Sequence, residues 1–321
     1  MKNINIAIVG CGRISKRHIE AIDANEGAHL TAVCDLQEDR MSAGLLEGRD
    51  LIRVTNYTEL TGRGIDAVAV CTPSGLHPVH AAEITEQTDI PAVIVEKPIS
   101  LTVREAFELF KRIDRAGKRL VPVYQNRYNP LVQFTRELIN NGTLGTIHQF
   151  NVNIFWNRND DYFKIDWHGT RDLDGGVLYT QASHYVDMLL YLFGPVTQAK
   201  GLGGRLRQLE VQDSISAVLE HENGAVGSLN CTVSTYRQNY QTEFTVIGSK
   251  GTVRLQGTNL NTINFWDVDG MEKPDMDFTL DHIYGKGHDF LYQYLLKGDL
   301  DKFPTRDEVV TGIELMERLS F

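Results

Sequence analysis

The 321-residue sequence has no apolar segment approaching the roughly 20 residues needed to span a bilayer. Its amino terminus, MKNINIAIVG, lacks the apolar core and cleavage site of a secretory leader and has the pattern of a strand entering a turn. Four cysteines are scattered without a CxxC spacing or a metal-ligand pattern. These absences predict a reduced, cytoplasmic protein with no metal centre and no membrane partner.

The sequence is also poor in positive charge. Its 32 Lys and Arg against 42 Asp and Glu leave a net charge of −10, which argues against nucleic acid or an anionic membrane surface as a partner. A composition of 42% hydrophobic and 23% charged residues is typical of a globular protein with a full core. The length predicts two domains.

Residues 1–122 alternate short β-rich runs with helical patterns. The runs are mostly continuous and apolar, which is typical of a parallel sheet buried on both faces. Thr102 and Glu105 form a capping box for a helix that ends at Gly117. This alternation predicts a doubly wound parallel sheet. The predicted strands cover residues 4–10, 30–35, 65–72, 92–97 and 119–124.

Residues 123–321 no longer alternate buried apolar runs with helical patterns. A helix at 131–141 precedes the segment 147–156, whose alternating apolar and polar residues predict a half-exposed antiparallel strand. We therefore predict a second α/β domain with a large open, mostly antiparallel sheet, covered by helices on one face and free for water or another subunit on the other. Later elements are predicted at 184–193 (helix) and at 214–220, 225–234, 242–248 and 251–257 (strands).

The motif GCGRIS at 10–15 follows the first predicted strand and opens the first helix. Gly10 permits a tight turn, Gly12 lets the backbone approach a pyrophosphate, and Ser15 is small enough for close helix–strand packing. Asp35 closes the next strand, where an acidic side chain binds a ribose 2′-hydroxyl and repels a 2′-phosphate. The pattern predicts a dinucleotide site that prefers NAD to NADP.

A second motif, VIVEKPIS at 93–100, places Glu96, Lys97 and Pro98 at the carboxyl end of a buried strand. Ligands of open α/β sheets bind at this end of the strands, so we expect Lys97 where a nicotinamide and a substrate meet. Pro98 disfavours helical backbone at Lys97.

The segment GGVLYTQASHYVDMLLYLFG at 175–194 predicts a largely apolar helix that carries His184 and, one turn on, Asp187. A histidine in this setting is either a core side chain hydrogen-bonded to its neighbour or an active-site group. The cofactor motif and Lys97 favour the active-site interpretation.

These motifs together resemble the glucose–fructose oxidoreductase/inositol dehydrogenase family (Gfo/Idh/MocA) over nearly the whole length. The resemblance includes CTPSGLHPVHA (71–81), QNRYNP (125–130), DGGVLYTQASHYVD (174–187) and IGSKGTVRL (247–255). The family implies an amino-terminal Rossmann domain, an open sheet that builds homodimers or homotetramers, and hydride transfer between NAD(P) and a sugar-like alcohol.

The resemblance also implies roles for individual residues. It assigns Lys97 and His184 to catalysis, and leaves open which of them is the base. The cofactor-binding set is Gly10, Gly12, Arg13, Ile14, Asp35, Thr72, Pro73, His77, Glu96, Lys97 and Gln125. The substrate-binding set is Lys97, Arg127, Tyr128, Asn129, Arg158, Tyr162, Thr180, Gln181, Ser183 and His184.

Within the family, QNRYNP, TQASHYVD, WNRNDDYF (156–163) and HGT (168–170) are most similar to bacterial UDP-N-acetylglucosaminuronate 3-dehydrogenases of surface-polysaccharide pathways. His168 stands where that subgroup would have an arginine. The alternatives are an inositol or monosaccharide dehydrogenase, and a sensor that binds nucleotide and sugar without turnover.

Thr180 departs from many polyol-oxidising relatives, which carry an aspartate one turn before the histidine. Threonine cannot stabilise an imidazolium as a carboxylate would. Asp187 either replaces that carboxylate in part or has a packing role. The departure favours the nucleotide-sugar alternative, with Lys97 carrying more of the chemistry.

Overall fold

The structure, a computed structural model, describes residues 3–276 and 286–320. The chain forms two compact units, Met1–Tyr124 with His288–Val310, and Gln125–Gly287 with Thr311–Phe321. The segment His288–Val310, which the sequence analysis places in the second domain, thus packs with the first unit. In its helix α8 (Lys286–Lys297), Leu291 and Tyr292 are completely buried. The order of elements along the sequence does not predict that this helix packs with the first unit.

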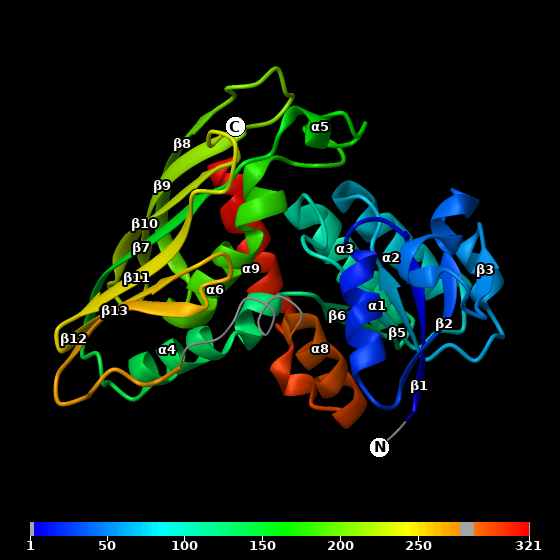
Figure 1. The fold of residues 1–321 in the computed structure, drawn as a ribbon, viewed down its shortest axis with the longest axis horizontal. Helices are drawn as coiled ribbons and strands as arrows, with labels where there is room; N and C mark the ends of the chain where they lie inside the picture. Colours follow the sequence, from blue (N-terminus) through cyan, green and yellow to red (C-terminus); the bar gives the residue numbers. More distant parts are fainter. Residues whose placement is uncertain (1–2, 277–285, 321) are drawn as a thin grey trace. The chain divides into compact units, whose positions relative to one another are not determined.

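The first unit is built on a six-stranded sheet in which all neighbouring strands are parallel (Figure 1). The order β3-β2-β1-β4-β5-β6 confirms the predicted doubly wound sheet, with its reversal of winding between β1 and β4. The strands are β1 (Ile4–Val9), β2 (Ala28–Cys34), β3 (Ile52–Val54), β4 (Ala67–Val70), β5 (Ala92–Val95) and β6 (Arg119–Pro122). The other helices of the unit are α1 (Ser15–Ala24), α2 (His77–Gln87) and α3 (Val103–Arg115).

Helix α3 shows how local sequence sets these elements. The Thr102 side chain accepts a hydrogen bond from the Glu105 backbone N–H, and the Glu105 carboxylate accepts one from the Thr102 N–H, so the predicted capping box is present. The residues of α3 that are buried recur at helical spacing: Ala106, Leu109, Phe110 and Ile113.

The second unit contains a seven-stranded sheet of order β13-β12-β11-β7-β10-β9-β8. Its central strand β7 (Ile147–Phe155) is antiparallel to β11 but parallel to β10, so the predicted antiparallel strand lies in a mixed sheet. The remaining strands are β8 (Val196–Gly204), β9 (Ser214–His221), β10 (Val226–Thr232), β11 (Gln241–Gly248), β12 (Gly251–Gln256) and β13 (Thr262–Val268).

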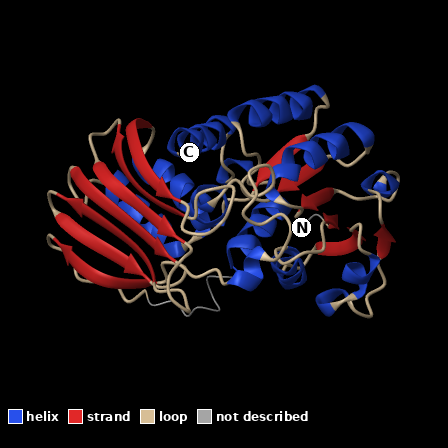
Figure 2. Cartoon of the chain, turned by 90° about the horizontal axis from the view of Figure 1, so that it is seen from above, coloured by secondary structure: helices blue, strands red, loops and turns tan. Residues whose placement is uncertain are grey.

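Helices cover one face of this sheet (Figure 2). Phe193 of helix α6 (Ser183–Phe193) stacks on Phe150 of β7 with ring centroids 4.8 Å apart, and Phe134 of helix α4 (Pro130–Asn140) stacks on Trp266 of β13. The other helical segments of the second unit include the turn η5 (Gln125–Tyr128), α5 (Asp160–Phe163) and part of α9 (Arg306–Leu319). On the uncovered face Val218 of β9 is 58% exposed.

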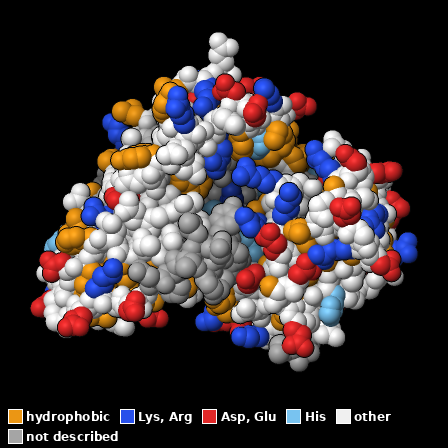
Figure 3. All heavy atoms as spheres, in the orientation of Figure 1, with side chains coloured by type: hydrophobic (Ala, Val, Ile, Leu, Met, Phe, Trp, Pro, Cys, Tyr) orange, Lys and Arg blue, Asp and Glu red, His pale blue; other side chains and the backbone are white. Residues whose placement is uncertain are grey.

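In the chain as described, from residue 3 to 276 and from 286 to 320, no helix has both the length and the apolar character to cross a membrane. On the first unit, drawn on the right in Figure 3, acidic and basic side chains are interspersed over the surface. The net charge is therefore distributed on this face rather than gathered in one patch.

Candidate active site

The glycine turn lies at the reversal of winding in the first unit. Gly10 follows β1 with a φ of +95°, and a Cβ at this position would lie 2.8 Å from the Cys71 carbonyl group and 2.9 Å from the Thr72 nitrogen. Only glycine combines this φ with such a close approach to the loop after β4. A Cβ at Gly12 would meet no heavy atom within 4 Å, so the turn leaves open space beside the amino terminus of α1.

Asp35 connects the end of β2 to this turn. Its Oδ2 accepts a hydrogen bond from the Cys11 N–H at 2.7 Å, and its Oδ1 accepts one from the Gln37 N–H at 2.9 Å. The half-exposed carboxylate keeps acceptor capacity for a ribose hydroxyl. Arg13 is exposed and Ile14 is half-buried in the same turn. These residues fit a dinucleotide bound with its pyrophosphate at the start of α1.

His77 joins the loops that follow β4 and β5. Its Nε2 and Nδ1 lie 2.7 Å from the Thr72 and Pro98 carbonyl oxygens respectively. Burial lowers the pKa of His77, and the two carbonyl groups partly oppose that shift. The imidazole therefore fixes the shape of both loops, a structural role, while Thr72 and Pro73 remain half-exposed beside the turn.

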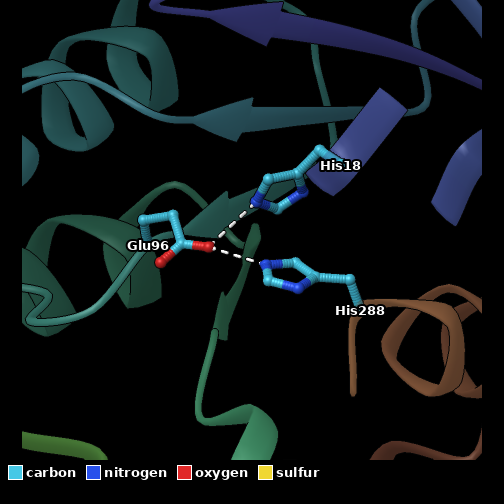
Figure 4. A group of neighbouring side chains, drawn as sticks. All are labelled: His18, Glu96 and His288. Carbon is cyan, nitrogen blue, oxygen red and sulfur yellow. Dashed lines mark hydrogen bonds and ion pairs between the residues drawn. The ribbon is translucent and has the colours of Figure 1, made fainter. Parts of the chain in front are cut away.

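Lys97 is half-exposed after β5, and the Lys97–Pro98 peptide bond is cis. The preceding Glu96, which the sequence assigned to cofactor binding, is 4% exposed. Figure 4 shows its carboxylate between the imidazoles of His18 and His288. No sequence pattern predicts this cluster, because His288 lies 192 positions from Glu96.

His184 is half-exposed on a helix that is otherwise buried. From Gln181 to Phe193 every residue is buried except His184 and Tyr191. A core histidine would be buried with its neighbours, so this placement supports the active-site interpretation. The preceding turn, η6 (Leu178–Ala182), is a π-helix, a geometry often found at functional sites.

Four of the predicted substrate residues line one small pocket of the second unit: Arg158, Tyr162, Thr180 and Gln181. Arg158 Nη2 donates to Gln181 Oε1 at 2.8 Å, and the guanidinium lies 5.6 Å from the Tyr162 ring centroid. Thr180 donates its hydroxyl hydrogen to the Gly176 carbonyl oxygen at 3.0 Å. The pocket therefore presents an oriented cation next to an aromatic ring.

The remaining predicted residues lie in the interior of the second unit. Arg127 forms a buried ion pair with Asp187, and Asn129 caps α4 while donating to the Asn259 carbonyl oxygen at 2.7 Å. Tyr128 and Ser183 are 3% and 1% exposed. Gln125 is half-exposed in η5. Arg127 and Asn129 thus have structural partners of their own.

Two further features were not predicted from the sequence. Gln212, 5% exposed, lines the Arg158 pocket, and neither its Nε2 nor its Oε1 has a hydrogen-bond partner among the described residues. His168 Nδ1 lies 3.4 Å from an oxygen of Asp174, and its ring stacks on Tyr162 at a centroid distance of 3.8 Å. The only sequence indication of these His168 contacts was that a histidine stands where the similar subgroup would have an arginine.

A dinucleotide turn at the carboxyl end of a parallel sheet, together with a lysine at the end of another strand of that sheet, is the arrangement of a nicotinamide-dependent oxidoreductase. Residues 4–124 match the family model "Oxidoreductase family, NAD-binding Rossmann fold", and residues 132–254 match "GFO/IDH/MocA C-terminal domain". The chain belongs to the Gfo/Idh/MocA oxidoreductase family, and NAD is its cofactor.

Solved structures extend the similarity to the full length. The chain is 33% identical to the WlbA dehydrogenase from Bordetella pertussis in complex with NADH and UDP-GlcNAcA, covering 99% of this chain and 95% of that one with a TM-score of 0.88. It is 32% identical to the WlbA dehydrogenase from Chromobacterium violaceum, covering 99% and 92% with a TM-score of 0.86. It is 26% identical to inositol 2-dehydrogenase of Rhizobium meliloti, over 85% of this chain and 82% of that protein.

Proposed function

We propose that this chain oxidises a sugar secondary hydroxyl with NAD, namely C3 of UDP-N-acetylglucosaminuronic acid, in the synthesis of surface-polysaccharide sugars such as those of lipopolysaccharide O-antigen. The pocket of Arg158, Gln181 and Gln212 is the observation that carries this proposal. Its oriented guanidinium suits a uronate carboxylate or a diphosphate, and the Gln212 amide offers one donor group and one acceptor to a polar sugar. The similarity to two WlbA dehydrogenases supports the same substrate.

Oxidation of the alcohol requires removal of its hydroxyl proton as the C–H bond breaks. Bound NAD supplies a nicotinamide that accepts the hydride from the carbinol carbon. Lys97 or His184 accepts the hydroxyl proton, and the other donates a hydrogen bond that orients the oxygen. Both side chains are half-exposed and so remain accessible to a ligand.

A carboxylate partner at position 180 is absent in this mechanism. Thr180 donates to the Gly176 carbonyl oxygen, and Asp187 accepts hydrogen bonds from the Arg127 guanidinium. These contacts support the packing role for Asp187 over the alternative in which it partly replaces the missing carboxylate. The mechanism gives Lys97 the larger share of the proton transfer, because Thr180 cannot stabilise a protonated His184 as a carboxylate would.

The test is NADH formation by the purified protein with UDP-N-acetylglucosaminuronic acid, compared with inositols and free monosaccharides, each with NAD and with NADP. Turnover of the nucleotide sugar with NAD at a kcat/KM at least about tenfold above the others is the expected result. A higher kcat/KM for an inositol or a free sugar would show that the proposed nucleotide-sugar substrate is wrong. Binding of nucleotide and sugar without NADH formation would indicate a sensor.

A further inference from the structure

A buried polar cluster joins three separate segments of the first unit. His18 comes from α1, Glu96 follows β5, and His288 and Tyr292 come from α8 (Figure 4). The four side chains range from 0% to 4% exposed. Buried polar groups of this kind are retained only when hydrogen bonds satisfy them, so the contacts within the cluster decide what it does.

Two sets of hydrogen-bond contacts converge on Glu96, one from Tyr292 through His18 and one from His288. His18 Nε2 and His288 Nε2 lie 3.1 and 2.9 Å from the same carboxylate oxygen, Oε1. The Tyr292 hydroxyl lies 2.7 Å from His18 Nδ1. A hydroxyl that donates to Nδ1 places the proton of His18 on Nε2, which then donates to Glu96.

The charge of Glu96 follows from these contacts. Although burial favours the protonated acid, hydrogen bonds from His18 and His288 hold the pKa of Glu96 well below its usual range. Burial also lowers the pKa of His18, which keeps that imidazole neutral. The cluster thus holds a carboxylate between two imidazole N–H groups.

The geometry favours this arrangement over a metal ion. The donor atoms of His18, Glu96 and His288 lie within 4.8 Å of one another, which would allow a cation. A structural zinc site, however, uses four ligands, and the cluster supplies three. Distances of 2.9 and 3.1 Å from two nitrogens to one oxygen are those of N–H···O hydrogen bonds.

The second oxygen of Glu96 connects the cluster to Lys97. Oε2 accepts a hydrogen bond from the Lys97 backbone N–H at 3.1 Å. The two imidazoles fix the plane and rotamer of the carboxylate, and the carboxylate fixes the Lys97 backbone. We propose that His18 and His288 are positioning residues for Lys97, acting through Glu96. This inference rests on the catalytic role proposed for Lys97.

Helix α8 therefore carries a positioning residue, His288. It also carries a residue for a matched control, Leu291. Leu291 lies on the same helix, is fully buried and belongs to the core rather than to the cluster. His288→Ala removes a donor to Glu96, His288→Gln restores an N–H donor near the same position, and Leu291→Ala opens a cavity without touching the carboxylate. All three variants are compared with wild type in the same buffer.

The first measurement is steady-state NADH formation. We expect His288→Ala to lower kcat about tenfold or more, with KM for NAD changed less than about threefold, because a small displacement of a catalytic group has large kinetic effects. His288→Gln should recover most of kcat. Leu291→Ala should lower the melting temperature and leave kcat near wild type.

The second measurement, amide hydrogen exchange, needs no substrate. Pro98 has no N–H, so the difference between two peptides that begin upstream of Glu96, one ending at Glu96 and one at Pro98, reports on the Lys97 amide alone. Exchange should be about tenfold faster in His288→Ala than in wild type or Leu291→Ala.

Equal exchange in His288→Ala and Leu291→Ala would overturn the proposal. Retention of one equivalent of zinc by the purified wild type, lost in His288→Ala, would overturn it in favour of a metal site. A normal rate in Lys97→Ala would instead refute the proposed role of Lys97, and the exchange comparison would still decide whether the cluster positions its backbone.

Discussion

Arg127 and Asp187 form a two-point ion pair between η5 and the helix that carries His184. Arg127 Nε donates to Asp187 Oδ2 at 2.8 Å and Nη2 donates to Oδ1 at 2.7 Å. The side chains are 5% and 4% exposed. The Arg127 guanidinium also lies 4.9 Å from the ring centroid of Tyr191. An arginine that the sequence suggested for substrate binding is thus part of the scaffold of α6.

Asp187→Asn should lower the free energy of unfolding by about 3–5 kcal/mol, because it leaves the Arg127 cation buried without its counter-charge. Urea denaturation measures this. The matched control is Asp161→Asn, which breaks the Asp161–Lys164 pair, whose side chains are 76% and 75% exposed. That change should have little effect. Equal losses in the two variants would contradict a structural role for the buried pair.

Lys97→Ala and His184→Asn should each lower kcat by about 10²- to 10⁴-fold, the usual range for loss of a proton-transfer group. NADH formation measures kcat, and cofactor titration should show that NAD still binds. His148→Gln changes an exposed histidine on β7 and should leave kcat unchanged. Near-normal rates in both active-site variants would rule out the proposed chemistry.

Gln212→Ala should lower kcat/KM for the substrate about tenfold without lowering the melting temperature. The amide has no partner among the described residues, so its removal sacrifices no protein hydrogen bond but would lose one to a ligand. Gln149→Ala, at an exposed position of β7, is the control and should change neither quantity. A fall in stability with unchanged kcat/KM would assign Gln212 a structural role instead.

Stability should decrease as the pH falls from 8 to 5. Burial lowers the pKa of His18, His77 and His221 from 6.5, so the unfolded chain takes up protons before the native one. Below pH 6.5 each such histidine lowers the free energy of unfolding by at most about 1.4 kcal/mol per pH unit, until the pH falls below its pKa in the native protein. Melting temperatures at pH 5, 6, 7 and 8 measure this.

Gln149→Ala provides the comparison for that pH series, because this exposed side chain does not titrate and its loss should leave the slope unchanged, whereas His221→Asn should reduce it. A melting temperature that is constant, or that rises toward pH 5, would contradict the lowered pKa of these buried histidines.

The uncovered face of the seven-stranded sheet should bind a second copy of the chain, giving a homodimer or homotetramer. Leu202, Val218 and Val226 are exposed there on β8, β9 and β10. Val218→Asp should shift the molar mass toward that of a monomer in light scattering. Val79→Asp, on α2 of the other unit and 48% exposed, should not. A monomeric wild type would refute this interface.

The parallel sheet could be predicted from the sequence because its strands are buried apolar runs with capped helices between them. Strand β8 was missed because VTQAKGLGG contains three glycines, which weaken any strand pattern. Strand β3 was not predicted, and with three residues it is too short to show a pattern. Strand β2 was predicted but begins at Ala28, two residues before its predicted start. The mixed direction of β7 follows from pairing with β10, which no local pattern encodes.

The sequence locates those features of the candidate site that depend on neighbouring residues, and it does not locate those that depend on distant partners. The glycine turn, Asp35 and Lys97 lie next to strand ends that the sequence marks clearly. The Arg127–Asp187 pair spans 60 positions and the His288–Glu96 contact spans 192, so no spacing rule reveals either. Gln212 shows no motif at all and is distinguished only by its unsatisfied amide.

The π-helix η6 bears on how this chain should be aligned with other sequences. Its wide turn, Leu178–Ala182, accommodates one residue more than an α-helical turn, as a single-residue insertion would. A homologue with a regular helix here would have the residues upstream of Ala182 rotated by about 100° relative to His184. An alignment that ignores the wide turn would therefore pair Thr180 with a residue that lies on a different face of the homologue's helix.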